Sequence, residues 1–172
     1  MRNKAKWCSL LLLGPVLLLG SLTSSACSVN QERQQVYDFL TKKLTPIMEE
    51  INGLTARYNE ITQIPPLVAL TKEEEMLSLL HDLRYDTETV KIKIVGIAAP
   101  QPCREVRDKM IQLLELMLQA QDKSIAYFDD YDINNLEQAN KLAREASELI
   151  TEIADDIYDI CQEYDIEYKY PK

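Results

Sequence analysis

The chain has 172 residues, of which 28 are acidic and 19 basic, and its formal net charge is −9. This balance argues against a nucleic-acid-binding protein, because phosphates are neutralised by Lys and Arg, and equally against docking on anionic lipid headgroups by charge. The length suits one domain with a hydrophobic core, and the scarcity of glycine favours long helices over a β-sandwich.

Residues 1–26 have the layout of a secretory signal peptide, with cationic residues first, then an apolar run, then small polar residues. The cations all lie in the first six positions, and the leucine-rich run covers residues 7–19. A membrane-spanning helix needs about 20 apolar residues. The shorter run, interrupted by Gly14 and Pro15, therefore fits a cleaved signal better than a transmembrane anchor.

The signal ends in Ser24-Ser25-Ala26-Cys27, which resembles the lipobox of bacterial lipoproteins, although that family prefers leucine where Ser24 stands. The resemblance covers residues 1–27 only. It implies that the Cys27 thiol receives a diacylglyceryl group and that cleavage leaves Cys27 as the first residue. Two or more acyl chains, such as palmitate, would anchor the protein firmly at about 0.8 kcal/mol per buried CH₂.

In that family, a residue such as Ser28 after the cysteine accompanies transport to the outer membrane where the envelope has two. The alternative to lipidation is ordinary signal-peptidase cleavage, which Ser24 and Ala26 would also suit, giving a secreted soluble helical protein. Residues 27–172 keep 16 basic residues against all 28 acidic ones, a formal charge of −12. Attachment to a membrane would therefore have to come from the lipid.

The cysteine count fits lipidation. Cys8 leaves with the signal, and Cys27, Cys103 and Cys161 remain, an odd number for an oxidising compartment. Lipidation of Cys27 leaves one pair. Cys103 and Cys161 each lie 29 residues from Asp132, so a helical hairpin turning there would bring them together. A disulfide closing that loop would add about 4 kcal/mol by the chain-entropy estimate; two buried free thiols are the alternative.

Four stretches carry apolar residues at alternating spacings of three and four, the stripe that a bundle helix buries. They run from Val36 to Ile61, from Met76 to Ile97, from Cys103 to Tyr131 and from Leu136 to Tyr164. Pro46 interrupts the first stretch and predicts a kinked helix, with two helices broken at Thr45-Pro46 as the alternative. Within residues 88–97 several side chains are β-branched and apolar residues alternate with polar ones, a pattern that would suit a strand. The unbroken heptad spacing of the apolar residues favours a helix.

Pro-rich or polar turns separate these stretches, at residues 64–66, 100–102 and 132–134. Thr71 and Asn134 each stand three residues before a glutamate, a capping-box spacing that predicts the starts of the second and fourth helices. The fold class predicted is all-α, an antiparallel up-down-up-down four-helix bundle with long helices. We assign residues 1–26 to a signal peptide, 27–33 to a lipid-anchored linker, 34–164 to the bundle and 165–172 to a frayed acidic tail.

The sequence indicates no catalytic residue, metal site or cofactor, and we expect a protein that is not an enzyme. His81 is the only histidine and falls on the predicted solvent face, without a partner for a zinc or di-iron site. Asp130, Asp132 and Asn134 match the first ligand positions of a calcium-binding EF-hand loop, but Lys141 stands where the loop needs its glutamate. We interpret this segment as an acidic turn and helix cap.

The first and third turns gather apolar and aromatic residues at one end of the predicted bundle. We define the candidate partner tip as Leu67, Tyr127, Phe128 and Tyr131. A helix of about 30 residues rises about 45 Å, so the tip would stand that far from the Cys27 tether. Exposed patches of this kind mark partner sites, with simple capping of the core as the alternative.

These observations lead to one functional hypothesis and one alternative. We expect an extracytoplasmic lipoprotein, anchored in a bacterial membrane through its lipid, that acts as a helical binding or structural module for a protein partner. The alternative is a carrier of a small apolar ligand, because the stripes contain small alanines and adaptable methionines that could leave room between helices.

Overall fold

The computed structural model describes residues 29–64 and 71–169. The signal peptide, Cys27 and Leu67 therefore lie outside the described residues. The chain divides into two units, residues 1–35 and 36–172. In the first unit the described residues, 29–35, are helical, although the sequence predicted a linker up to residue 33.

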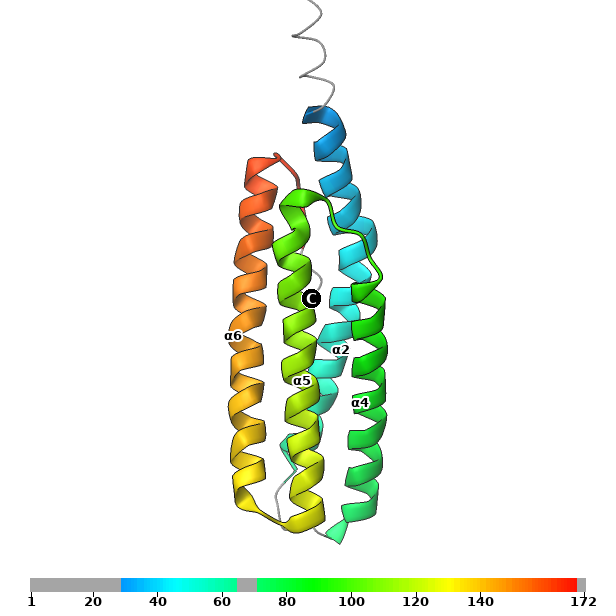
Figure 1. The fold of residues 1–172 in the computed structure, drawn as a ribbon, viewed down its shortest axis with the longest axis vertical. Coiled ribbons are helices and arrows are strands. Elements are labelled where there is room, and N and C mark those ends of the chain that lie inside the picture. Colours follow the sequence, from blue (N-terminus) through cyan, green and yellow to red (C-terminus); the bar gives the residue numbers. More distant parts are fainter. Residues whose placement is uncertain (1–28, 65–70, 170–172) are drawn as a thin grey trace, which may run out of the picture. The chain divides into compact units, whose positions relative to one another are not determined.

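All regular structure described in the second unit is helical (Figure 1). Its elements are η1 (Phe39–Leu44), α2 (Thr45–Thr62), α4 (Glu73–Val95), η2 (Gln101–Cys103), α5 (Arg104–Asp130) and α6 (Ile133–Glu163). Four helices pack against one another, α2 with α4, α4 with α5, and α5 with α6. The all-helical prediction is confirmed, and the ambiguous residues 88–95 belong to α4 rather than to a strand.

The chain stays helical across Pro46 because η1 is a π-helical turn. Proline lacks an N–H and collides with the carbonyl four residues earlier, so an ordinary α-helical turn cannot accommodate it without distortion. Thr45 closes the wider turn: its backbone N–H and its Oγ1 both donate to the Leu40 carbonyl oxygen, the hydroxyl at 2.9 Å. The alternative of two helices broken at Thr45-Pro46 does not describe this segment.

The apolar stripes form the core. Every stripe residue from Val36 to Tyr58 in η1 and α2, and from Met76 to Ile94 in α4, is buried. The fourth stripe departs from this pattern, because Ala143 and Ile150 of α6 are only half-buried. These two residues line a cavity together with residues of α2 and α5.

Ion pairs cross between the same helices that share the core. They are Arg57–Asp86 and Lys93–Glu50 between α2 and α4, Arg84–Asp122 and Lys91–Glu115 between α4 and α5, and Lys109–Asp156 between α5 and α6. Most of these side chains are well exposed, so each pair contributes only about 0–1 kcal/mol. The pairs align neighbouring helices, while the core supplies most of the stability.

Both helix starts differ from the capping-box prediction. α4 begins at Glu73, with Lys72 at the N-cap position and no side-chain cap hydrogen bond, so the predicted start at Thr71 is wrong. α6 begins after Asp132, whose carboxylate accepts the backbone N–H of Asn134 at 3.0 Å. The cap of α6 is therefore Asp132 rather than Asn134, in agreement with the interpretation of this segment as an acidic turn and cap.

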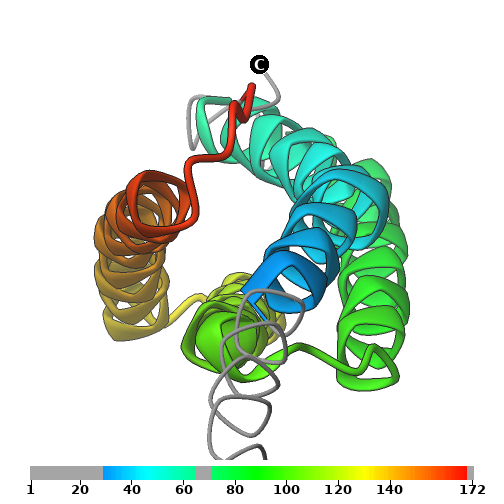
Figure 2. The ribbon, with the colours of Figure 1, turned by 90° about the horizontal axis from the view of Figure 1, so that it is seen from above.

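The segment after α6 packs on the bundle, although the sequence predicted a frayed tail. Ile166 donates its N–H to the Cys161 carbonyl at 2.9 Å, and Ile166 and Tyr168 pack against the core. The Tyr168 hydroxyl lies 3.0 Å from Thr45 Oγ1 and 3.6 Å from Met48 Sδ. Figure 2 shows this segment crossing from α6 towards α2. We call it the C-terminal strap, residues 165–168.

Candidate functional site

The candidate tip is a cluster of aromatic side chains with a small cavity behind it. Three of its four predicted residues lie together, because the Tyr127 ring meets Phe128 at 5.5 Å and Tyr131 at 6.2 Å between centroids, both edge-to-face. The cavity has a volume of about 100 Å³. It is lined by Ile61, Thr62, Ile64, Met76, Leu80, Ser124, Tyr127, Phe128 and Leu136. Ends of α2, α4, α5 and α6 thus contribute to one site.

The three aromatic residues differ in what they present to solvent. Phe128 is buried, Tyr127 is half-buried, and Tyr131 is 51% exposed. Tyr131 ends α5 in the left-handed conformation, with a φ of 50°, and its hydroxyl donates to the Glu73 carboxylate. This hydrogen bond to the carboxylate raises the pKa of Tyr131. The tip therefore exposes one tyrosine to solvent, while Phe128 belongs to the core.

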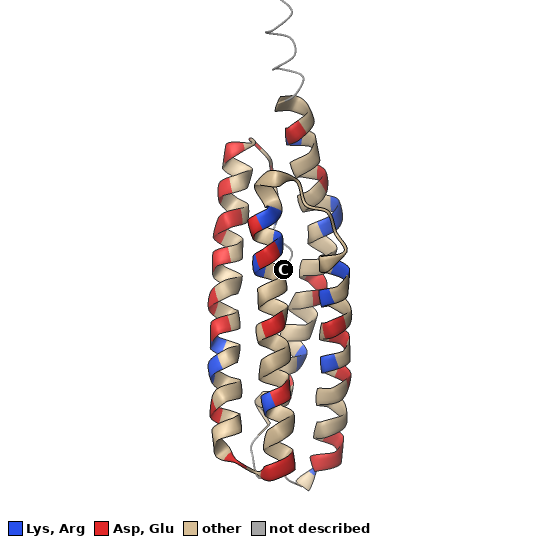
Figure 3. Ribbon diagram, viewed as in Figure 1, with Lys and Arg blue, Asp and Glu red and all other residues tan. Residues whose placement is uncertain are grey.

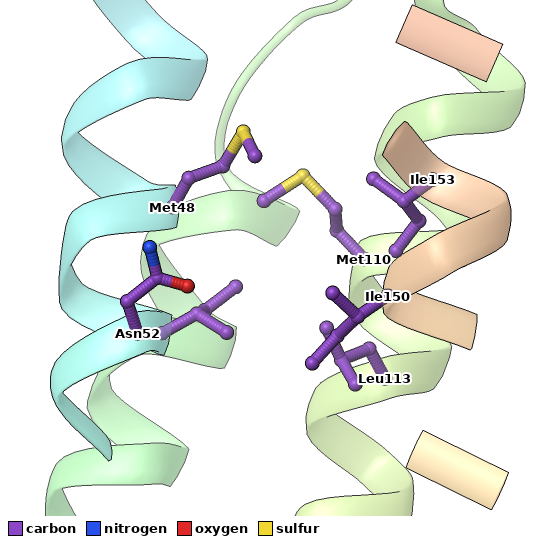
Figure 4. A pocket seen from close by; sticks show the side chains of 7 residues that line it. Met48, Asn52, Met110, Leu113, Ile150 and Ile153 are labelled. Carbon is purple, nitrogen blue, oxygen red and sulfur yellow. The ribbon is translucent and has the colours of Figure 1, made fainter. Parts of the chain in front are cut away.

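A second candidate site, which sequence reasoning missed, is an apolar groove between α2 and α6. α2 and α6 are not among the closely packed helix pairs of the described chain. Two adjoining cavities lie between them over α5, with volumes of about 100 Å³ and about 20 Å³, and Leu113 and Ile150 line both. Figure 4 shows Met48 and Asn52 of α2 facing Met110 of α5 and the isoleucines of α6 across the smaller cavity.

The groove has an apolar floor and a partly polar wall. Its lining residues are Met48, Ile51, Asn52, Thr55, Tyr58, Asn59, Met110, Leu113, Met117, Ala120, Ala143, Ala146, Ser147, Ile150 and Ile153. The sequence signal that could have found it is the small alanines of the fourth stripe, which leave room between helices. Residues of α2 form the opposite wall of the wider cavity, although α2 and α6 are not among the closely packed helix pairs.

The cavity volumes decide between a small ligand and a larger partner. Pockets that enclose small molecules commonly measure about 300–1,000 Å³. An apolar cavity of about 150 Å³ holds only a molecule of the size of benzene. The cavities at the tip and in the groove, at about 100 Å³ or less, fall below both values. Neither place encloses enough space for a ligand of ordinary small-molecule size.

Two polar contacts are buried between the helices. Tyr58 Oη lies 2.9 Å from Ser124 Oγ, which also donates to the Ala120 carbonyl, and burial raises the pKa of Tyr58. Gln121 Nε2 donates to Thr87 Oγ1 at 2.9 Å, while Gln121 Oε1 accepts no hydrogen bond from the described residues. These contacts join α2 to α5 and α4 to α5, and we assign them structural roles.

Cys103 and Cys161 are both buried and both free, so the predicted disulfide is not formed in the structure. Cys103 lies in η2, and η2 contacts α6, the helix that contains Cys161. Burial, with a smaller contribution from Cys161, raises the pKa of the Cys103 thiol to about 12. Disulfide formation proceeds through a thiolate, which such a pKa makes scarce.

These raised pKa values predict that stability falls at alkaline pH. The Cys103 thiol keeps its proton in the folded state up to about pH 12, whereas in the unfolded chain it ionises near its ordinary value of 9.0. Between these values the unfolded state binds fewer protons, so the free energy of unfolding decreases as pH rises. Below the pKa of the thiol in the unfolded chain, 9.0, the contribution of Cys103 to the free energy of unfolding is fully present. Urea unfolding from pH 8 to pH 11 measures it.

A Cys103→Ala variant is the control for the alkaline loss, because it removes the titrating group while leaving a small apolar side chain. It should lose less stability over the same pH range than the parent protein. Burial also raises the pKa values of Tyr58 and Tyr168, so part of the loss should remain in the variant. A parent protein with the same urea midpoint at pH 8 and pH 11 would contradict the prediction.

The remaining sequence candidates lie apart from these sites. His81 is exposed on α4, as expected. Asp130 accepts the backbone N–H of Asp132 within the turn. Among the residues described, no group of three His, Cys, Asp or Glu side chains could hold a metal ion. Over the same part of the chain, no helix is both long enough and apolar enough to cross a bilayer.

Comparison with known proteins gave no relatives: no family model, curated protein or solved structure matches the chain.

Proposed function

We propose that the protein is a non-enzymatic lipoprotein on the outer side of a bacterial membrane and that its helical domain binds a protein partner. The lipobox-like Ser24-Ser25-Ala26-Cys27, placed directly after an apolar run too short to span a bilayer, carries the proposal of an anchor. The cysteine count also supports an anchor, because the mature chain keeps an odd number of cysteines unless Cys27 is lipidated. Ser28 favours the outer membrane where the envelope has two.

In this proposal the domain is an antiparallel up-down-up-down bundle. The side-chain pairs support that topology, because residue numbers rise in one helix as they fall in its neighbour. Between α2 and α4 the pairs are Glu50 with Lys93 and Arg57 with Asp86. Between α4 and α5 they are Arg84 with Asp122 and Lys91 with Glu115. Two antiparallel helices require this order.

The same proposal includes a bend in the first helix at Pro46. Sharp bends in helices occur at prolines and at π-helical turns, and η1 and Pro46 supply both within a few residues. A bend there lets the helix carry its apolar stripe from Val36 to Tyr58 along a core that the later helices share.

Intact-mass analysis of the full chain made in a bacterium tests the anchor. The expected mature protein lacks residues 1–26 and carries a diacylglyceryl group on Cys27. A Cys27→Ser variant is the control and should carry no acyl mass. A mature N-terminus at another residue would contradict the proposal, and unacylated protein cleaved before Cys27 would favour the alternative of a secreted soluble protein.

A photo-crosslinking amino acid at the tip tests the partner surface. Placed at position 131, which is 51% exposed, it should give one discrete crosslinked product in cells. Positions 85 and 158, at 72% and 62% exposure, are matched tyrosine controls on α4 and α6 and should give none. Equal crosslinking at all three positions, or none at 131, would count against a partner at the tip.

The carrier alternative is supported less well. Its motive is the adaptable methionines and small alanines that line the groove, yet the enclosed volumes of about 20 and about 100 Å³ leave little room for a ligand.

A further inference from the structure

We propose that the C-terminal strap opens and closes while the helices stay folded, and that its opening uncovers the thiol of Cys161. The strap thus acts as a gate that regulates the reactivity of this thiol. The proposal rests on the way the strap is attached to α6 at one end and to α2 at the other. It is independent of the lipid anchor and of the tip.

The sequence of the strap alternates polar and apolar side chains. Asp165 and Glu167 are exposed, whereas Ile166 and Tyr168 are half-buried and pack against the core. Alternation of this kind places side chains on the two faces of an extended segment. The strap therefore lies with its apolar face on the bundle and does not continue α6, as the path in Figure 2 shows.

The strap leaves α6 through a left-handed residue. Asp165 has a φ of 49°, a conformation that costs free energy for residues other than glycine. The next residue, Ile166, donates its N–H to the Cys161 carbonyl oxygen at 2.9 Å, which turns the chain back over the end of the helix. The packing of the strap must offset the cost of this turn, so only part of the packing energy favours the closed state.

The far end of the strap is attached to the start of α2 by a side chain. The Tyr168 hydroxyl lies 3.0 Å from Thr45 Oγ1 and 3.6 Å from Met48 Sδ. Because the Thr45 hydroxyl already donates to the Leu40 carbonyl oxygen, the Tyr168 hydroxyl is the donor to Thr45. α2 and α6 are not among the closely packed helix pairs, so this contact links helices that pack mainly on others.

The thiol behind the strap is buried in the closed state. Cys161 is 7% exposed and belongs to the cluster against which Ile166 and Tyr168 pack. Burial raises the pKa of the Cys161 thiol, and the reactive form of a cysteine is the thiolate. Lifting the strap removes part of this burial, so the thiol becomes both more accessible and easier to ionise.

The helices have their own packing and can outlast the strap. α2 packs with α4, α4 with α5 and α5 with α6, and none of these pairs involves residues 165–168. Residues 166–169 belong to no helix or strand, whereas α4 and α5 contribute fully buried residues to the core. Segments near a chain end and outside regular structure open at a lower free energy than core helices do. The strap is therefore expected to open before the bundle unfolds.

Two rates measured on the full chain test the proposal. Hydrogen exchange of the Ile166 amide reports directly on the strap, because that N–H is bonded in the closed state. Labelling of Cys161 by N-ethylmaleimide, located by peptide mass spectrometry, reports on the thiol. Tyr168→Phe should accelerate both rates by about twofold to tenfold, as the loss of one hydrogen bond predicts. Tyr158→Phe, the same change at a tyrosine of α6 that is 62% exposed, should alter neither.

A core variant separates opening of the strap from unfolding of the bundle. Leu83→Ala weakens the core and should accelerate exchange of the α4 amides, but it should leave the Ile166 and Cys161 rates unchanged. A chain that ends at Tyr164 has no strap. It should keep the helical content of the parent protein in circular dichroism and label Cys161 faster than Tyr168→Phe does.

Four outcomes would overturn the proposal. Parallel acceleration of Ile166 and the α4 amides in Leu83→Ala would mean that the strap opens only when the bundle unfolds. Equal rates in Tyr168→Phe and Tyr158→Phe would mean that the contact with α2 does not hold the strap closed. Unchanged labelling of Cys161 in the shortened chain would mean that the strap does not cover the thiol. Loss of helical content in that chain would make the strap part of the bundle.

Discussion

Leu83→Ala should lower the free energy of unfolding by about 2–5 kcal/mol, the range found for large-to-small changes in packed cores. Leu83 has an exposed fraction of 0% and belongs to the cluster that all four helices share. Shortening its side chain removes apolar contacts and leaves a cavity that the helices cannot fully close. Chemical denaturation monitored by circular dichroism measures the loss as a lower denaturant midpoint at unchanged slope.

The matched control for Leu83→Ala is Leu79→Ala, one turn earlier on the same helix. Leu79 is 40% exposed, so the same substitution removes less buried surface there, and alanine has the higher helix propensity. We expect the Leu79 variant to lose less than about 1 kcal/mol, since it creates no internal cavity. Equal losses at the two positions would show that the stripe containing Leu83 is not the core.

Thr87→Val should destabilise the protein by about 1–3 kcal/mol, because it leaves the Gln121 amide buried without its acceptor. The Thr87 hydroxyl donates to the Leu83 carbonyl at 2.8 Å and accepts from Gln121 Nε2. Gln121→Met should be much less costly, because it removes the Oε1 atom that has no partner among the described residues and leaves the Thr87 hydroxyl bonded to Leu83. Thermal and urea unfolding measure both.

The double variant Thr87→Val with Gln121→Met completes the cycle. It should be more stable than Thr87→Val alone, because replacing both polar partners by apolar groups removes the penalty of an unpaired amide. A double variant whose losses simply add would show that the two side chains do not act as a pair. Recovery in the double variant would also show that this polar contact is not a net source of stability.

Much of the core could be predicted from the sequence, because helical geometry turns a spacing of three and four residues into one face. The stripe from Met76 to Ile94 is buried at every predicted position up to Ile94. The disturbance at Pro46 also follows from local chemistry, since the missing N–H and the ring clash act within one turn. The π-helical turn that absorbs it, in which Thr45 donates twice to the Leu40 carbonyl, could not be predicted from helix propensities.

The groove could not be predicted, because periodicity shows which face is apolar but not whether another helix covers it. Ala143 and Ile150 have the same heptad signature as the buried Ile153 and differ only in their neighbours in space. Gln121 was missed for the opposite reason: it is polar but 1% exposed, since Thr87 of another helix supplies its partner. At the tip, Tyr127, Phe128 and Tyr131 were found because they are close in sequence.

The Tyr168 hydroxyl pair with Thr45 has a mechanical consequence for the first and last helices of the domain. Near Thr45 this contact ties the C-terminal strap, and through it the end of α6, to the start of α2. α6 is therefore joined to α2 at this end through the chain that follows it, in addition to the indirect path through α5 and α4.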